Sequence, residues 1–157
     1  FNVPLYAEFI NQIVMKFNPH IVIGHSIGGN AVAYFQSNYQ HNFDKIVLLG
    51  APSDFKIILE NYFKILGLNS KIKQQFLVYI KSRFTIVIED FSAANFLKES
   101  TLPGFIAHDL NDIVVRIEEG KKIANSWKTA TFIETKELGH SLHDAILYQT
   151  ISDFIEK

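Results

Sequence analysis

The chain has 157 residues, of which 48% are hydrophobic and 13% aromatic, which is enough apolar material for one compact core. Fifteen lysines and arginines against sixteen aspartates and glutamates give a net charge of −1, and no basic block indicates a nucleic acid or anionic lipid partner. The absence of cysteine excludes a disulfide framework, a thiolate zinc site and a cysteine nucleophile. We therefore expect a single domain that acts on a neutral small molecule.

The sequence shows no targeting or membrane-spanning segment. No apolar run reaches the roughly 18 residues of a membrane-spanning helix, and the N-terminus lacks the basic and apolar regions of a signal peptide. We expect a protein with no membrane span and a cytoplasmic location. The chain opens on Phe1 with a segment typical of the middle of a fold, so we also expect it to derive from a longer protein.

Helical and extended patterns alternate along the chain. Apolar side chains at helical spacing predict amphipathic helices, and short β-branched runs that stop at a glycine predict buried parallel strands. Such an alternation predicts an α/β protein, with a parallel sheet covered by helices on both faces. The predicted strands span residues 20–25, 45–50, 102–109 and 129–135, and the predicted helices span residues 4–17, 30–39, 118–127 and 141–157.

A helical insertion interrupts this alternation at residues 53–100. Its periodicities are helical throughout and are broken by Gly67 and polar joints. The core is then expected in residues 1–52 and 101–157. The insertion is rich in large apolar side chains, a surplus of which would line an apolar pocket above the site described below. They are Phe55, Ile58, Tyr62, Phe63, Leu66, Phe76, Tyr79, Ile80, Phe84, Phe91 and Phe96.

Residues 24–28 match the motif G-x-S-x-G and stand between a predicted strand and a predicted helix. This context makes Ser26 a candidate nucleophile on a strained turn, with Gly24 and Gly28 leaving room for the backbone. The amide of Ile27, at the start of the helix, would donate to an oxyanion. The alternative of an anion-binding turn has less support, because the chain has neither G-x-G-x-x-G nor a phosphate-loop lysine.

A serine nucleophile needs an imidazole within hydrogen-bond reach, and the imidazole needs a carboxylate that orients it. Asp112 follows the predicted strand 102–109, and His140 follows the predicted strand 129–135. Both side chains are therefore expected at the carboxyl edge of the sheet, where Ser26 also lies. No metal and no organic cofactor is needed for this chemistry.

Four segments together resemble the α/β-hydrolase superfamily: GHSIGG, LLGAP, HDLNDIVV and ELGHS. In that family the nucleophile, the acid and the base follow in this chain order. The acid loop commonly reads H-[GD]-x-x-D-x-x-V-P, which assigns the acid to Asp112, while Val115 stands where proline is usual. The resemblance implies a catalytic triad of Ser26, Asp112 and His140, and it implies that residues 53–100 form the cap.

Other side chains compete for these roles. Asp109, which we expect to cap the strand end or contact a neighbouring loop, and Asp54, which follows the second strand, are alternative acids. His143 is three residues from His140 and is expected on the surface of the same helix. His25, inside the motif, is expected to pack or hydrogen-bond beneath the loop.

The resemblance also differs from the family pattern at the N-terminus. The family begins with strands that precede the first helix of this chain, and a loop after one of them supplies a second oxyanion amide. Loss of one such donor typically costs about 100- to 1,000-fold in rate. We expect the 157 residues alone to be weakly active or inactive.

The sequence thus predicts a serine hydrolase that cleaves a neutral or apolar carboxylic ester, or a thioester or amide, through an acyl-serine. A C–C bond hydrolase of the same fold is one alternative. An aminopeptidase is another, in which Glu60, Glu89 or Asp90 would bind the substrate amine. The last alternative is a binding module without turnover.

Overall fold

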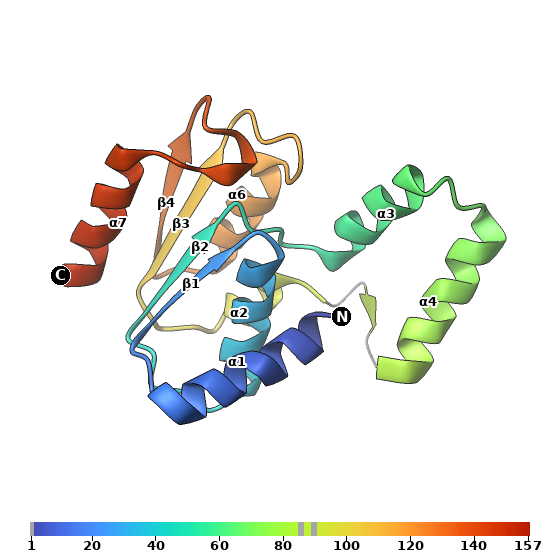
Figure 1. Ribbon diagram of the computed structural model, residues 1–157, viewed down its shortest axis with the longest axis horizontal. Helices are drawn as coiled ribbons and strands as arrows, with labels where there is room; N and C mark the ends of the chain where they lie inside the picture. The colour runs from blue at the N-terminus through green and yellow to red at the C-terminus, as the bar shows by residue number, and fades with distance from the viewer. Residues whose placement is uncertain (1, 85–86, 89–90) are drawn as a thin grey trace.

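The computed structural model describes residues 2–84, 87–88 and 91–157 (Figure 1). Four parallel strands form one sheet in the order β1-β2-β3-β4. The strands are β1 Ile21–His25, β2 Lys45–Leu49, β3 Gly104–Asp109 and β4 Ala130–Thr135. The helices are α1 Val3–Phe17, α2 Ile27–Asn38, α3 Phe55–Ile65, α4 Ser70–Phe84, α5 Ala93–Leu97, α6 Ile117–Ser126 and α7 Ala145–Glu156, and a 3₁₀ turn, η2, spans Gly139–Ser141.

Strand side chains alternate between two apolar layers, as the pleat requires. Ile46, Leu48 and Ile106 belong to a core cluster with side chains of α1, α2, α5 and α6. Val47 and Phe105 point to the opposite face, where they meet Leu147 and Ile151 of α7 and Leu142. The sheet is therefore covered on both faces, and the predicted α/β architecture is confirmed.

The parallel register aligns the carboxyl ends of the strands. His25 pairs with Leu49, Leu49 with Ala107, and Asp109 with Thr135. The loops that follow β1, β2, β3 and β4 consequently gather at one edge of the sheet. This edge carries the candidate site.

Two local predictions are wrong. The strand at 20–25 is not fully buried, because β1 lies at the edge of the described sheet, and Ile23 is 52% exposed. The helix predicted from residue 141 begins at Ala145, because Leu142 adopts a left-handed backbone with φ of 53°. The carboxylate of Asp144 then accepts a hydrogen bond from the Leu147 amide and caps α7.

The segment 53–100 divides into two environments. Helices α3 and α4 form a hairpin that projects from the sheet and its covering helices (Figure 1), whereas Ala93 and Leu97 of α5 are buried in the main core. Asp54, which precedes α3, forms an antiparallel bridge with Ser92, which precedes α5. The division into a core and a cap at these boundaries remains a prediction.

A buried carboxylate holds the beginning of this segment. Glu119 of α6 accepts hydrogen bonds through Oε2 from the amides of Ser53 and Asp54, at 3.0 and 2.8 Å. Burial raises the pKa of Glu119, and the nearby Asp54 acts in the same direction against the two amide hydrogen bonds. Among the described helices, none is long and apolar enough to cross a bilayer.

Candidate active site

Ser26 occupies the sharp turn between β1 and α2. Its backbone has φ of 53° and ψ of −129°, a conformation that non-glycine residues adopt only at a cost. The surrounding structure holds it there: the Ser26 amide donates to the Leu49 carbonyl at 2.9 Å, and the Ser26 carbonyl accepts from Gly29 at 2.9 Å. The turn places Ser26 at the carboxyl edge of the sheet, between the end of β1 and the start of α2.

The glycines of this turn have unequal steric roles. A Cβ on Gly24 would lie 2.7 Å from the Cα of Gly29, and a Cβ on Gly29 would lie 2.5 Å from the Cβ of Ala51. A Cβ on Gly28 would meet nothing closer than the Tyr6 hydroxyl, at 3.4 Å. The close approach of strand and helix therefore depends on Gly24 and Gly29, although the sequence motif names Gly24 and Gly28.

One hydrogen-bonded chain joins Ser26, His140 and Asp112. The Nε2 atom of His140 lies 2.9 Å from the Ser26 hydroxyl, and its Nδ1 atom lies 2.7 Å from Oδ2 of Asp112. The Asp112 side chain is fully buried, whereas that of His140 is 21% exposed. An imidazole bonded in this way has Nδ1–H directed at the carboxylate, which leaves Nε2 free to accept the serine proton.

The Asp112 carboxylate is itself fixed by its loop. Oδ1 accepts hydrogen bonds from the amides of Val114 and Val115, at 2.8 and 2.9 Å. The buried imidazole of His108 lies 3.5 Å from Oδ2 through its Nε2 atom, which also bonds the Val115 carbonyl at 2.8 Å. The loop amides thus bind Oδ1, and Oδ2 is the oxygen that bonds to His140.

Two residues of this arrangement were missed by the sequence reasoning. Gly50, with φ of 53°, borders the pair, since a Cβ there would lie 3.4 Å from Nδ1 of His140 and 3.5 Å from Oδ2 of Asp112. In the sequence, His108 stands out only as the first residue of the HDLNDIVV loop. The signal for Gly50 was its position directly after a strand that ends at the same edge.

The competing acids have other partners. Asp109 accepts hydrogen bonds from the Thr135 hydroxyl at 2.8 Å and from the Leu138 amide at 3.0 Å, so it contacts the neighbouring loop. Burial alone would raise the pKa of Asp109, but these hydrogen bonds and those from nearby amides lower it. Asp54 forms an ion pair with Lys122 of α6. The His140 ring is hydrogen-bonded to neither of these carboxylates but to Asp112.

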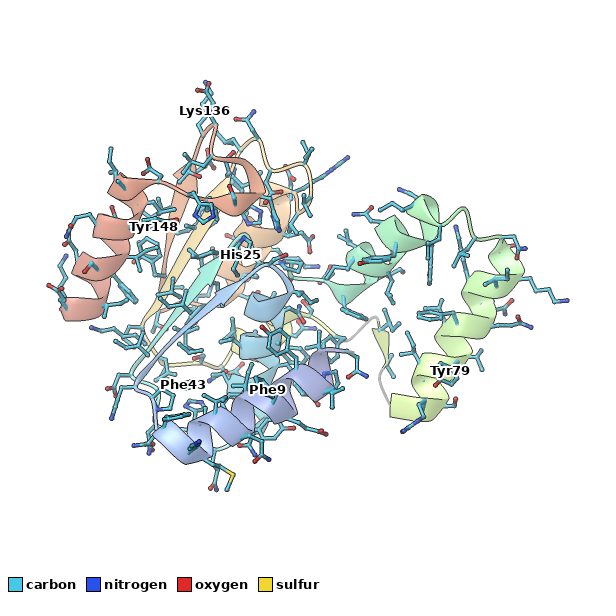
Figure 2. All side chains as sticks on the ribbon, in the orientation of Figure 1. Phe9, His25, Phe43, Tyr79, Lys136 and Tyr148 are labelled. Atoms are coloured by element: carbon cyan, nitrogen blue, oxygen red, sulfur yellow. The ribbon has the colours of Figure 1, made fainter. Side chains whose placement is uncertain are left out.

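The other histidines near the turn differ in role. His25 lies at the end of β1 (Figure 2), and its Nε2 atom is 2.8 Å from the carbonyl oxygen of His140. The prediction that His143 lies on a helix with His140 is wrong, because the 3₁₀ turn ends at Ser141 and α7 begins after His143. The ring of His143 contacts the Tyr148 hydroxyl instead.

Ile27 is the first residue of α2. The first amides of a helix have no acceptor within the helix, and the helix dipole is positive at this end. The Ile27 amide is therefore available to an anion beside Ser26. Within residues 2–84, 87–88 and 91–157, no cluster of three histidine or carboxylate side chains is arranged to hold a metal ion.

Solved structures resemble almost the whole chain. An α/β hydrolase enzyme from the metagenome of sediments of the Mar Chica lagoon in Morocco matches with a TM-score of 0.71 and 18% identity, over 99% of this chain and 70% of that one. This chain has the α/β-hydrolase fold. In α/β hydrolases the nucleophile stands on the turn between a strand and a helix, which is where Ser26 lies.

Further α/β hydrolases give similar values. An esterase from Exiguobacterium antarcticum matches with a TM-score of 0.70 and 16% identity, over 99% of this chain and 74% of its own. A meta-cleavage product hydrolase from Pseudomonas fluorescens IP01 matches with a TM-score of 0.69 and 14% identity, over 99% and 72%. A scan against protein-family models and a search of curated proteins each give no match.

Proposed function

We propose that this protein is a serine hydrolase that cleaves a neutral or apolar carboxylic ester, thioester or amide through an acyl-serine intermediate. The observation that carries the proposal is the unbroken hydrogen-bonded chain from the Ser26 hydroxyl through His140 to Asp112, with separations of 2.9 and 2.7 Å. The three residues come from three separate loops. Packing of the fold alone does not require their side chains to be aligned in this way.

The first half of the reaction acylates the serine. Ser26 Oγ attacks the carbonyl carbon of the substrate while its proton passes to Nε2 of His140, and Asp112 stabilises the imidazolium that forms. The negative charge on the former carbonyl oxygen is met by the Ile27 amide. The tetrahedral intermediate then collapses, and the leaving alcohol, thiol or amine takes the proton from Nε2.

The second half regenerates the enzyme. A water molecule gives a proton to Nε2 of His140 and attacks the acyl carbon through its oxygen. Collapse of the second intermediate breaks the bond to Ser26 Oγ, which recovers the proton from Nε2, and releases the carboxylic acid. Atoms and charges balance with the residues named, and the mechanism uses no metal ion and no organic cofactor.

The preference for an ester without charge has two supports. The loop that carries Asp112 exposes the apolar side chains of Leu110, Ile113 and Val114 at the carboxyl edge of the sheet, and an esterase is among the structural neighbours. An ester is also less demanding than an amide, because an alcohol leaving group needs less help from the general acid than an amine does.

A C–C bond hydrolase is the second candidate, and the meta-cleavage product hydrolase among the neighbours favours it. The aminopeptidase alternative has no comparable support. Glu60 lines a cavity between α3 and α4, and Glu89 and Asp90 lie outside the described residues. A panel of p-nitrophenyl esters, amino-acid amides and a vinylogous diketone separates the three reactions by their products.

The test of the proposal is labelling by a fluorophosphonate together with hydrolysis of short p-nitrophenyl esters. The parent chain should be labelled at Ser26 and the Ser26→Ala variant should not, while melting curves of the two proteins coincide. Labelling is included because it needs only one reaction of the serine with the probe. It therefore detects an activated serine even where steady-state hydrolysis is slow. A folded parent whose Ser26 is not labelled would contradict the proposal and would favour a binding module.

A further inference from the structure

The α3–α4 hairpin has a charge opposite to that of the rest of the chain. Residues 55–84 contain six cationic side chains and a single carboxylate, that of Glu60, although the whole chain has a net charge of −1. The cations are Lys56, Lys64, Lys71, Lys73, Lys81 and Arg83. The sequence alone favours a solvated face over a recognition patch for these side chains, since they are spread along two helices, but the structure brings Lys56, Lys64 and Lys73 to one cavity.

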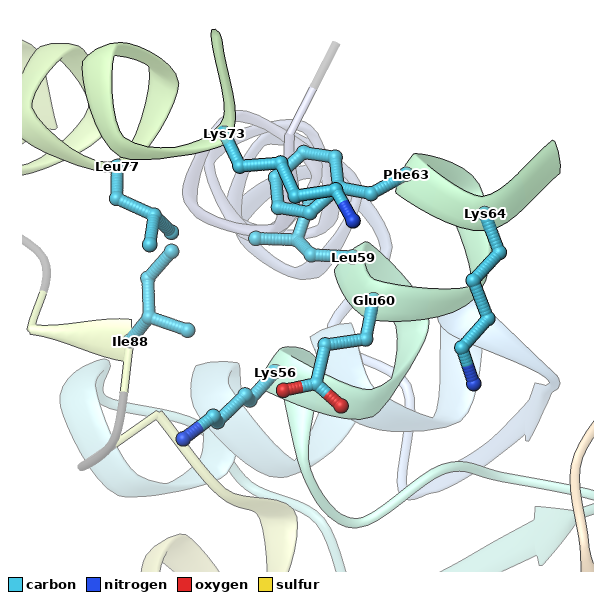
Figure 3. Close-up of a pocket in the computed structure, with 8 residues that line it drawn as sticks. All are labelled: Lys56, Leu59, Glu60, Phe63, Lys64, Lys73, Leu77 and Ile88. Carbon is cyan, nitrogen blue, oxygen red and sulfur yellow. The ribbon is translucent and has the colours of Figure 1, made fainter. Parts of the chain in front are cut away.

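The hairpin also borders a cavity of about 310 Å³ that is partly open to solvent. Its apolar wall consists of Leu59, Phe63, Leu77 and Ile88. Leu77 and Ile88 point toward one another from opposite sides (Figure 3), and Phe63 and Ile88 are only 6% and 5% exposed. The volume lies within the range of small-molecule sites.

Three lysines stand at the boundary of this apolar wall. Lys56, Lys64 and Lys73 line the cavity together with Glu60, and the ammonium group of Lys73 lies 5.9 Å from the centre of the Phe63 ring. None of the three forms an ion pair with a carboxylate of the described residues. Among the described residues, the cavity therefore combines an apolar wall with three lysines and one glutamate.

We propose that this cavity binds a single-chain anionic amphiphile of the fatty-acid carboxylate class, with the alkyl chain against Leu59, Phe63 and Leu77 and the head group at the rim that carries the lysines. Burial of the alkyl chain supplies the affinity. A charge-assisted hydrogen bond from a lysine to the carboxylate favours a negatively charged head group over a neutral or positive one. None of the lining residues belongs to Ser26, Asp112, His140 or their loops.

The inference extends the proposed function without requiring it. Hydrolysis of an apolar ester releases a carboxylate of this class, so the hairpin would hold the product or a related amphiphile apart from the reacting serine. Binding at the hairpin is measured by calorimetry and does not need turnover. Failure of the Ser26 chemistry and failure of this inference are therefore separate results.

The experiment is isothermal titration of the full chain with dodecanoate below its critical micelle concentration. We expect one site per chain, with affinity reduced about tenfold by Lys73→Gln and by Lys56→Gln, since each removes one positive charge from the rim. Lys81→Gln is the matched control, because Lys81 lies on α4 but does not line the cavity. Leu77→Ser tests the apolar wall and should weaken binding by a similar factor, with circular dichroism melting curves establishing that each variant is folded.

Three probes define the ligand class. Butyrate has the head group without the chain, and dodecyltrimethylammonium has the chain with the opposite charge; both should bind at least about tenfold more weakly than dodecanoate. Equal binding of the cationic amphiphile overturns the assignment of the lysines. If the protein binds phosphatidylglycerol vesicles but not monomeric dodecanoate, the occupant is a membrane surface and the cavity proposal is overturned. An equal loss of affinity in Lys81→Gln also overturns it.

Discussion

The imidazole of His25 is hydrogen-bonded to the backbone of His140, with 2.8 Å between Nε2 and the carbonyl oxygen. The two rings are tilted by 46°, with centroids 4.9 Å apart. The residue before the proposed nucleophile thus contacts the residue proposed as its base, across 115 positions of sequence. This bond joins the strained turn to the η2 loop directly, without passing through the sheet.

The first prediction concerns this bond. His25→Phe keeps a ring of similar size and removes the hydrogen bond, so the loop that carries His140 loses one restraint on its orientation. We expect kcat for p-nitrophenyl acetate to fall about tenfold with KM almost unchanged. A displaced general base stabilises the transition state less, whereas binding of the substrate in the ground state hardly changes.

The His25→Gln variant is the control for this positioning role, since its amide can donate to the same carbonyl and should recover much of kcat. His20→Gln changes an exposed histidine paired with Asp44 and should leave kcat as it is. Melting temperatures of the variants must lie within a few degrees of the parent's. A His25→Phe enzyme with the parent kcat refutes the positioning role.

The fold could be predicted because its determinants are local. β-branched runs such as the one at 45–50 are buried in β2, and the apolar alternation in β3 supplies both covered faces. The misjudged strand, β1, has the same local pattern, but its burial depends on neighbours beyond its own residues. Ile23 is half exposed at the sheet edge, and no pattern within a strand indicates its place in the strand order.

The candidate site was predictable to a similar extent. The chain order of Ser26, Asp112 and His140 and the strand before each of them bring these residues to one edge, since parallel strands end together. The contact between His25 and the His140 carbonyl was not predictable, because a backbone acceptor has no residue identity. The place of His108 beside Asp112 was hidden for a different reason: a histidine within an apolar strand has the pattern of any core residue.

The second prediction distinguishes the two acidic residues of the HDLND loop. Asp112→Asn leaves the geometry intact but offers the wrong group to Nδ1 of His140, and we expect kcat to fall on the order of 1,000- to 10,000-fold. Asp109→Asn removes charge from a group that holds Thr135 and Leu138. It should lower the melting temperature and reduce kcat much less. The reverse order of the two effects on kcat would assign the acid to Asp109.

The third prediction concerns the glycines of the turn. Gly29→Ala brings a Cβ to within 2.5 Å of the Ala51 Cβ, and the backbone must move apart at a cost of about 1 to 3 kcal/mol in the free energy of unfolding. Gly28→Ala has 3.4 Å to the Tyr6 hydroxyl and should cost much less. Urea unfolding of the two variants makes the comparison, and equal losses would contradict the steric assignment.

The last prediction concerns the pH dependence of stability. Burial lowers the pKa of the His108 imidazole, against the opposing effects of the Val115 carbonyl and Asp112. The unfolded chain binds a proton on this histidine as pH falls through about 6.5, whereas the folded chain keeps it neutral to lower pH. Stability from the neutral imidazole is thus fully present above pH 6.5 and is lost as pH falls below it.

The measurement is the free energy of unfolding in urea at pH 7.5, 6.5 and 5.5. His108→Asn cannot titrate in this range, so its stability should fall less steeply with pH than that of the parent, whatever its stability at pH 7.5. His20→Asn is the control, because His20 is exposed and its replacement leaves the buried imidazole in place, so the slope of the parent should remain. Equal slopes for the parent and His108→Asn would contradict the prediction. The pH dependence of the free energy of unfolding would then come from a group other than His108.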